Sequence, residues 1–294
     1  MLKLRYLRIL IFFTVLLATA GGPSALDAKG QPMRGGSSSL GTAENFAVLA
    51  GSTATNTGST IVTGDLGVWP GTEVTGFPPG IVNGTMYPGG AVAQQAQSDV
   101  TVAYNDLAGR PCNNDLTDTD LGGLTLTEAV YCFSSSAQLT GQLVLDAEGN
   151  ADALFIFQIG SMLTTASNSS VLVINNGTND PGCNVFWQVG SSATLGTATS
   201  FAGNILALTS ITLNTGADVS GRSLARNGAV TMDSNDISIA DCTETPTSVS
   251  LSSFGNDSPG NNIGLGLFLL VSLLAIAFWS WRNNRAAKRV RPAP

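Results

Sequence analysis

The residue types that most often carry out catalysis are scarce in this 294-residue chain. It contains no histidine, the commonest general base and metal ligand, so Ser-His-Asp and Cys-His catalysis are excluded. A paired-carboxylate hydrolase or lyase site could still be built from the acidic residues. We rank that hypothesis last, because no Lys/Arg cluster is present in the central part of the chain to neutralise an acidic polysaccharide. We therefore expect a protein that is not an enzyme and that uses no cofactor and no metal.

Four cysteines are the other reactive side chains, and they are spaced too widely for a CxxC metal or redox motif. An even number of cysteines is typical of disulfides in an exported chain, and both ends of this chain predict export. Four cysteines allow three connectivities. We favour Cys112–Cys132, which closes a short loop, and Cys183–Cys242, which ties the end of the domain to its body.

The two ends of the chain have the patterns of a secretory signal and a membrane anchor. Three basic residues precede an apolar run over 9–18, and Ala18-Thr19-Ala20 fits a signal cleavage site. Residues 263–281 are uncharged and long enough to cross a bilayer as a helix, and the basic tail after them predicts a cytoplasmic C-terminus with the ectodomain outside the cell. The predicted parts are a signal peptide (1–20), a flexible leader (21–40), a β-helix domain (41–242) with one helix (91–107), a Ser/Thr/Pro/Gly linker (243–262), a transmembrane helix (263–281) and a basic cytoplasmic tail (282–294).

The charge of the predicted ectodomain is strongly acidic. Without the signal and the tail, five basic residues remain against all 20 Asp and Glu. Such a balance repels phosphate backbones and anionic lipid surfaces, which argues against nucleic-acid binding. The membrane partner is therefore expected to be contacted through the C-terminal helix alone.

Segments of the domain repeat at fixed offsets, which is typical of solenoids. Each repeat contains short alternating apolar runs bounded by Gly, Asn or Asp, which predict short strands separated by turns. Eighteen residues suit one turn of a three-sided β-helix, in which the same side of successive coils stacks at about 4.8 Å. The repeated pairs are 155–170 with 185–200 (offset 30), 202–220 with 220–238 (offset 18), and 61–68 with 218–225.

One segment departs from this pattern. Small and apolar residues recur at helical spacing over 91–107, with Gln, Ser and Asp opposite, and Gly109-Arg110-Pro111 ends the run. We expect an amphipathic helix that packs along one side of the solenoid and covers apolar surface that the coils leave open.

Four long blocks give the ordered domain a resemblance to a known family. They are similar in sequence and in order to the microbial ice-binding proteins of the DUF3494 type. The resemblance implies an irregular right-handed three-sided β-helix with one long α-helix alongside, and one flat side that adsorbs to ice. The blocks are NFAVLAGSTATNTGSTIVTGDLGVWPGTEVTGFPPGIVNGT (45–85), AVAQQAQSDVTVAYNDLAGR (91–110), LGGLTLTEAVYCFSSSAQLTGQLVLDAEG (121–149) and NVFWQVGSSATLGTATSFAGNILA (184–207).

Threonines in phase with the repeats are the candidate binding residues. A surface that adsorbs to ice must be flat and rigid, with hydroxyls and methyls that order water, and threonine supplies both groups on a stiff side chain. The family resemblance adds a T-A/G-x-T/N motif, which this chain matches or nearly matches from Thr53, Thr57, Thr197 and Thr215. The last two are 18 residues apart and are expected to stack. The predicted ice-binding residues are Thr53, Thr55, Thr57, Thr60, Thr194, Thr197, Thr199, Thr212, Thr215 and Thr231.

Three charged residues lie in or near the motif that begins at Thr215. Asp218 ends the match that begins at Thr215, and its strong hydration shell suits ice poorly. Arg222 and Arg226 are expected to be solvated or paired with Asp. The partner predicted for the domain is ice with its ordered water, bound by a monomer. The alternative is a structural or adhesive surface solenoid that binds glycan or protein.

Overall fold

The computed structural model describes residues 40–177 and 180–240. The predicted signal peptide, the leader up to residue 39, the linker, the transmembrane helix, the tail and Cys242 lie outside the described residues. Leu40, which we assigned to the flexible leader, is buried against the helix side of the domain. Within the described ranges, no helix has the length and hydropathy that a membrane span requires.

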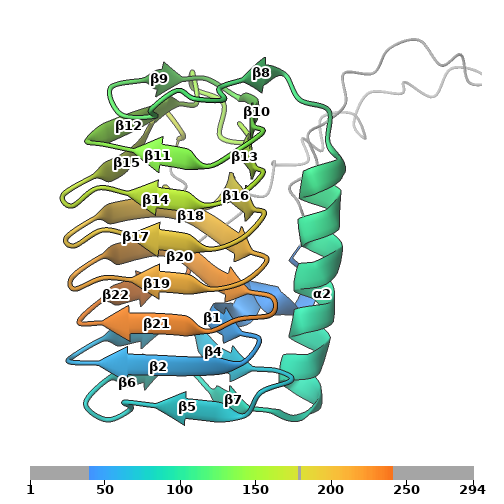
Figure 1. Cartoon of the computed structure of the whole chain (residues 1–294), viewed down its shortest axis with the longest axis vertical. Coiled ribbons are helices and arrows are strands. Elements are labelled where there is room, and N and C mark those ends of the chain that lie inside the picture. The colour runs from blue at the N-terminus through green and yellow to red at the C-terminus, as the bar shows by residue number, and fades with distance from the viewer. Residues whose placement is uncertain (1–39, 178–179, 241–294) are drawn as a thin grey trace, which may run out of the picture. The chain divides into compact units, whose positions relative to one another are not determined.

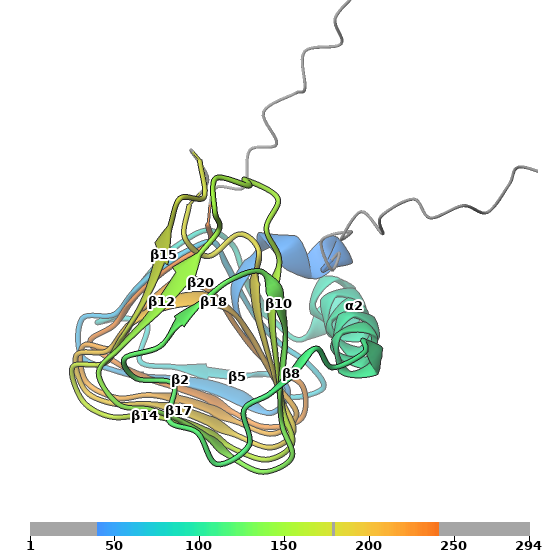
Figure 2. The same cartoon turned by 90° about the horizontal axis from the view of Figure 1, so that it is seen from above.

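The described residues form a three-sided β-solenoid of parallel strands with a helix along one side (Figures 1 and 2). Viewed from above, the coils superimpose as a triangle (Figure 2). One side, here called the seven-strand side, is a separate sheet. Its strands, in spatial order, are β11 (Ala137–Leu139), β14 (Leu163–Thr165), β17 (Ala193–Leu195), β19 (Ile211–Leu213), β21 (Val230–Asp233), β2 (Thr53–Thr57) and β5 (Glu73–Thr75).

The other two sides belong to one 15-stranded sheet, because β18 (Ser200–Ala207) and β20 (Asp218–Ala225) run around the corner between them. Gly203 and Gly221 have φ of 121° and 145° at this bend, and a Cβ on Gly221 would lie 2.1 Å from the Gly203 carbonyl oxygen. Only glycine fits such a bend. The helix side contains β8 (Asn114–Asp115), β10 (Ala129–Phe133), β13 (Phe155–Ile159), β16 (Val185–Val189), the second halves of β18 and β20, β1 (Phe46–Ala50), β4 (Asp65–Val68) and β7 (Met86–Pro88). The third side contains β9 (Thr125–Leu126), β12 (Gln142–Asp146), β15 (Ser170–Ile174), the first halves of β18 and β20, β22 (Asp236–Ser238), β3 (Ile61–Thr63) and β6 (Ile81–Asn83).

Strand pairing follows the repeats predicted from the sequence. Phe155 pairs with Val185 at the offset of 30, and Gly203 pairs with Gly221 at the offset of 18. The N-terminal coils stack beyond the last C-terminal coil, because β1 pairs with β20, β2 with β21 and β3 with β22 (Figure 1). The segment 61–68 therefore stands two coils from 218–225 in the same phase, as their similarity predicted.

The interior of the solenoid is apolar and contains a ladder of aromatic rings. Phe157 stacks on Trp187 with 3.9 Å between ring centroids, and Tyr131 and Phe201 extend the ladder at its two ends. The indole N–H of Trp187 donates to the Ala202 carbonyl oxygen at 3.1 Å, so burying this large side chain leaves no polar atom unpaired.

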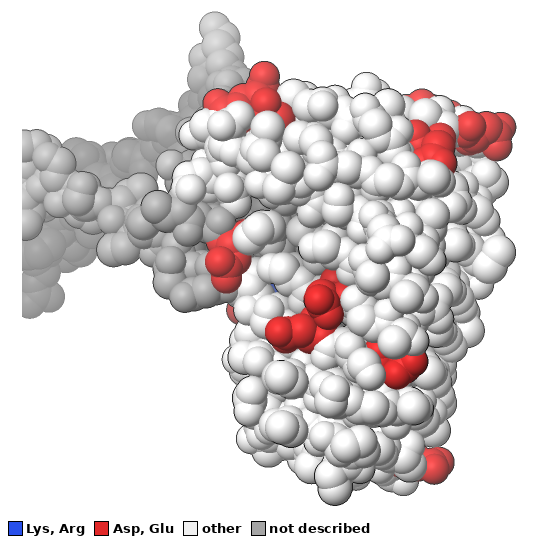
Figure 3. Space-filling model, turned by 90° about the vertical axis from the view of Figure 1, so that its left-hand side faces the viewer, with Lys and Arg blue, Asp and Glu red and all other residues white. Residues whose placement is uncertain are grey.

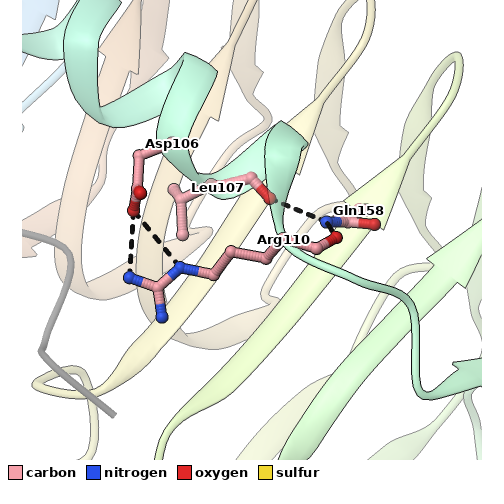
Figure 4. A network of polar contacts seen from close by, with 4 residues as sticks. All are labelled: Asp106, Leu107, Arg110 and Gln158. Atoms are coloured by element: carbon pink, nitrogen blue, oxygen red, sulfur yellow. Dashed lines mark hydrogen bonds and ion pairs between the residues drawn. The ribbon is translucent and has the colours of Figure 1, made fainter. Parts of the chain in front are cut away.

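The predicted helix is confirmed as α2 (Gly90–Gly109). Its buried face combines small side chains with Gln97, Tyr104 and Leu107, and packs against leucines of the helix side. These include Leu206 and Leu224. At its C-terminus, the amide nitrogen of Gln158 donates to the carbonyl oxygens of Leu107 at 2.7 Å and Arg110 at 2.8 Å (Figure 4). Leu107 lies in the last turn, whose carbonyls have no helical N–H four residues further on, and its oxygen also accepts from the backbone N–H of Arg110 at 3.4 Å.

The N-terminal 3-10 helix η1 (Gly41–Asn45) is joined to α2 by a carboxylate. Asp99 accepts hydrogen bonds from the backbone N–H of Thr42 at 2.8 Å and from its hydroxyl at 2.6 Å. Burial raises the pKa of Asp99, but these hydrogen bonds and one from Gln95 outweigh it, so the pKa is lowered.

The disulfide Cys112–Cys132 is present, as predicted, and joins the segment after α2 to β10. Cys183 is also disulfide-bonded, and its predicted partner, Cys242, lies outside the described residues.

The prediction for Arg222 was wrong. Arg222 is buried and donates to the Glu44 carbonyl oxygen and to Asn204 Oδ1, so it fastens η1 to the corner of the solenoid. Arg226 lies over the ring of Tyr104, 4.6 Å from its centroid, where a cation–π contact stabilises the helix packing.

Candidate functional site

The seven-strand side carries one straight row of threonines at the middle of its strands. Strand pairing places Gln138, Thr164, Thr194, Thr212, Thr231, Thr55 and Thr75 at the same register on consecutive coils. We call its six threonines, from Thr164 to Thr75, the threonine row. At the strand spacing of about 4.8 Å, its five intervals span about 24 Å.

The alternation of each strand makes the threonine row face outward. In β17 and β19 the residues before and after the threonine, such as Ala193 and Leu195, are buried in the apolar interior. Because successive side chains of a strand point to opposite faces, Thr194 and Thr212 must point outward. The hydroxyls of Thr55 and Thr231 are 3.4 Å apart, a direct contact across neighbouring coils of the row.

A second line of hydroxyls lies at the corner after these strands. Thr197 and Thr215 are exposed, and the backbone N–H of Ala198 donates to the Thr215 carbonyl oxygen at 3.0 Å, so they stack as predicted. The Thr215 hydroxyl donates to Asp233 on the next coil, and Asp233 pairs with Thr57. This line is therefore interrupted by a carboxylate.

On the opposite margin of the seven-strand side, polar, charged and apolar side chains alternate without a regular row. Thr53 pairs with Glu73, and the positions two residues before Thr164, Thr194 and Thr231 are Met162, Ser192 and Ala229. The charged residues of the side thus lie at its margins, on the outer coil at Glu73 and at the corner at Asp233, whereas the threonine row is uncharged.

Two predicted residues cannot contact a ligand at this surface. Thr60 and Thr199 are 0% and 1% exposed. Thr199 shares a hydrogen bond of 2.8 Å with Thr165 and donates to the Ala166 carbonyl oxygen, and the Thr60 hydroxyl accepts from the backbone N–H of Asn235. They fail as binding residues because a corner of the coil needs buried polar side chains to satisfy its backbone groups.

Asp218 also lies elsewhere than the motif implied. It begins the first half of β20 on the third side, where its carboxylate accepts from the backbone N–H of Asp236 at 2.8 Å. The expected charge within the binding row is therefore absent at this position. Figure 3, which shows the left-hand side of Figure 1, has acidic side chains in a few separate patches on a mostly uncharged surface.

The seven-strand side is held flat by its corners and by its backbone pairing. Asn168, Ala198, Gly216, Ser234 and Gly58 all have positive φ, between 54° and 79°, and turn consecutive coils in the same way. Hydrogen bonds between the coils, such as Asn168 N–H to the Thr197 carbonyl oxygen at 2.9 Å, connect these turns. Stacked ladders of this kind keep a sheet flat over many strands, and in the view from above the strands of this side lie along one edge of the triangle with a small stagger (Figure 2).

Thr164 and Thr75 belong to the threonine row but were missed by the sequence reasoning. Thr164 lies 30 residues before Thr194, at the offset of the repeat that joins 155–170 to 185–200, so the repeat contained the signal. Thr75 lies in β5, whose coil shows no sequence repeat, and only its pairing with β2 reveals it.

Among the residues that the structure describes, no group of His, Cys, Asp and Glu is placed to hold a metal ion. The seven-strand side has the geometry of an extended adsorption surface, because its outward hydroxyls and methyls repeat at one spacing.

The fold and the site together define a class of proteins. Its members are three-sided β-solenoids with a helix alongside, and one side presents a regular row of threonines to a ligand. The chain belongs to the Ice-binding-like family, whose model matches residues 48–238. It is 63% identical over 204 residues to an ice-binding protein of Nostoc sp. (strain HG1), which covers 69% of this chain and 74% of that relative.

Solved structures are similar as well. An ice-binding protein from an Antarctic biological consortium is 50% identical, with a TM-score of 0.65, and the match covers 69% of this chain and 90% of that one. The DUF3494 domain of Shewanella frigidimarina ice-binding protein 1 is 33% identical, with a TM-score of 0.62 and coverage of 69% and 97%.

Proposed function

We propose that this protein binds ice through the seven-strand side and so restrains ice growth or recrystallisation, or attaches the cell to ice. The single observation that carries the proposal is the threonine row, with six outward threonines in register on consecutive coils. The membership of the Ice-binding-like family and the names of the relatives support the same function.

The physical basis is the regularity of the threonine row. Each threonine presents one hydroxyl, which can hydrogen-bond water, and one methyl, which favours an ordered water layer without binding it strongly. Its branched side chain holds few rotamers, so little conformational entropy is lost when the surface is occupied. Ordered water that bridges two surfaces is enthalpically almost as favourable as a direct hydrogen bond. A flat row of such groups can therefore match a crystalline surface as a unit.

Within this proposal the predicted residues have different roles. Thr55, Thr194, Thr212 and Thr231 form the centre of the contact together with Thr164 and Thr75. Thr53, Thr57, Thr197 and Thr215 lie at the margins, where Glu73 and Asp233 hold hydration shells of their own. We expect the marginal threonines to contribute less than the central ones.

The location we propose is the outer surface of a cell. The signal pattern over 1–20 and the disulfide Cys112–Cys132 support export. The uncharged stretch over 263–281 and the basic tail support anchoring by a transmembrane helix with the tail in the cytoplasm. Protease treatment of intact cells tests this proposal, since the solenoid should be released while an epitope on the tail stays protected.

Ice recrystallisation in the presence of the purified full chain tests the proposed function. We expect crystals to stay smaller than in buffer with an equal mass of albumin, and a gap to open between melting and growth temperatures. Crystals that coarsen as in the albumin control, with the protein folded by circular dichroism, would refute ice binding.

A further inference from the structure

A pocket of about 410 Å³ lies on the helix side, near the C-terminal end of α2 and away from the threonine row. Its volume falls within the range of small-molecule sites, about 300–1,000 Å³. Polar and backbone groups from α2, β8, β10, β13 and β16 converge on it. Its lining includes Tyr104, Asp115, Ser134, Gln158 and Gln188.

The pocket lies where one outward-facing row of side chains on the helix side changes from leucine to glutamine. Strand pairing aligns Gln188 with Leu206, and Leu206 with Leu224, so the row continues from amide to leucine. The two leucines are buried under α2. At the level of Gln158 and Gln188 the helix is ending, and the row presents amides instead of apolar side chains.

Of these two amides, only one has a structural task. Gln158 donates to the carbonyl oxygens at the end of α2 (Figure 4). Gln188 is 7% exposed, and its side chain makes no hydrogen bond to any other residue within 40–177 and 180–240. The buried side-chain atoms without a partner in the described residues are Asn56 Oδ1 and Ser223 Oγ, so the amide of Gln188 is open to the pocket, at a place where the next coils carry leucine. The pocket therefore retains a polar group that the fold does not use.

The other polar groups around the pocket define the ligand chemistry. Asp115 is exposed, with a carboxylate that accepts the backbone N–H of Thr117 at 2.9 Å. The Ser134 hydroxyl accepts from the Thr117 hydroxyl at 3.2 Å, which leaves its own proton available to donate. Together with the Gln188 amide, these groups offer both donors and acceptors. No Lys or Arg lines the pocket, so nothing attracts an anion.

We propose that this pocket binds a neutral polyhydroxyl ligand the size of one sugar residue. Each hydroxyl of such a ligand both donates and accepts, which matches the alternation of amide, hydroxyl and carboxylate. Because the pocket and the threonine row lie on different sides, the domain can hold this ligand and ice at the same time.

Saturation-transfer NMR on the full chain, with a panel of neutral methyl glycosides, tests the proposal. We expect saturable binding of at least one sugar. The Gln188→Leu variant, which continues the leucine row, should weaken that binding about tenfold or more through loss of the amide hydrogen bonds. Gln142→Leu, at an exposed position on the third side, is the matched control and should leave binding unchanged.

Two further arms complete the design. Asp115→Asn alters an exposed pocket residue, so it tests the site even if Gln188→Leu unfolds the protein. Immobilised oligosaccharides distinguish a glycan end from a free sugar as the ligand. The proposal is overturned if no neutral sugar gives saturable binding, or if sugar binding is the same in both pocket variants as in the Gln142→Leu control.

Discussion

Replacing Thr212 with tyrosine tests whether the threonine row acts as one plane. Thr212 pairs with Thr194 on one side and Thr231 on the other, near the middle of the row. Each neighbour lies about 4.8 Å away. A phenol ring at this position stands above the hydroxyls on both sides, so a flat solid can no longer touch either neighbour.

The size of the effect follows from how many threonines can no longer reach the ice. Three of the six are removed from the surface, the substituted one and its two neighbours. If each contributes about 1 kcal/mol, as a typical hydrogen bond does, adsorption is weakened by about 3 kcal/mol. That corresponds to roughly a hundredfold weaker adsorption equilibrium. The free energy of unfolding should change by only about 0.5 kcal/mol or less, because the side chain faces solvent.

The assay compares ice recrystallisation endpoints over a dilution series of the full chain. Thr63→Tyr is the matched control, since Thr63 is an exposed strand threonine on the third side. We expect the endpoint concentration to rise strongly for Thr212→Tyr and to stay at the wild-type value for Thr63→Tyr. Full activity of Thr212→Tyr with an intact circular dichroism spectrum would refute the reasoning, and so would equal losses in both variants.

Three predictions concern the stability of the domain. Replacing both Cys112 and Cys132 with serine should lower the free energy of unfolding by about 3 kcal/mol, measured by urea denaturation. An unchanged urea midpoint would show that the disulfide does not stabilise the domain. Ser223→Ala should stabilise the fold by about 1 kcal/mol in the same assay, because the buried hydroxyl has no partner among the described residues, and a lower midpoint would contradict this. The lowered pKa of Asp99 means that its stabilising effect is complete above the unfolded pKa of about 3.9 and is lost as pH falls through the folded pKa. Asp99→Asn should therefore weaken the acid dependence of the melting temperature below pH 4, and an unchanged acid limb would show that the bonds to Thr42 contribute little.

Much of the fold was predictable because its order is local. The offsets of 30 and 18 residues reappear as strand registers, and the helical spacing over 91–107 reappears as α2. Four of the predicted threonines, Thr55, Thr194, Thr212 and Thr231, lie in the threonine row, since residues at equal repeat phase point to the same side of a solenoid.

The remaining features depend on contacts between distant parts of the chain. Repeat phase does not tell whether a threonine near a corner points outward, and the hydrogen bonds of Thr60 and Thr199 decide that both point inward. Arg222 was misread because its partner, the Glu44 carbonyl oxygen, is far away in sequence.

The sequence by itself determined the coil, its period and the helix, because these follow from the side-chain pattern within one or two repeats. Only the tertiary structure decided the length of the threonine row. The N-terminal coils stack on the C-terminal end of the solenoid, where β2 pairs with β21, and this adds Thr55 and Thr75 to the four threonines of the later coils. Every exposed parallel strand edge offers the same backbone hydrogen bonds to a strand in the right register. The sequence of one coil therefore does not decide which two edges of the solenoid pair; the rest of the chain does.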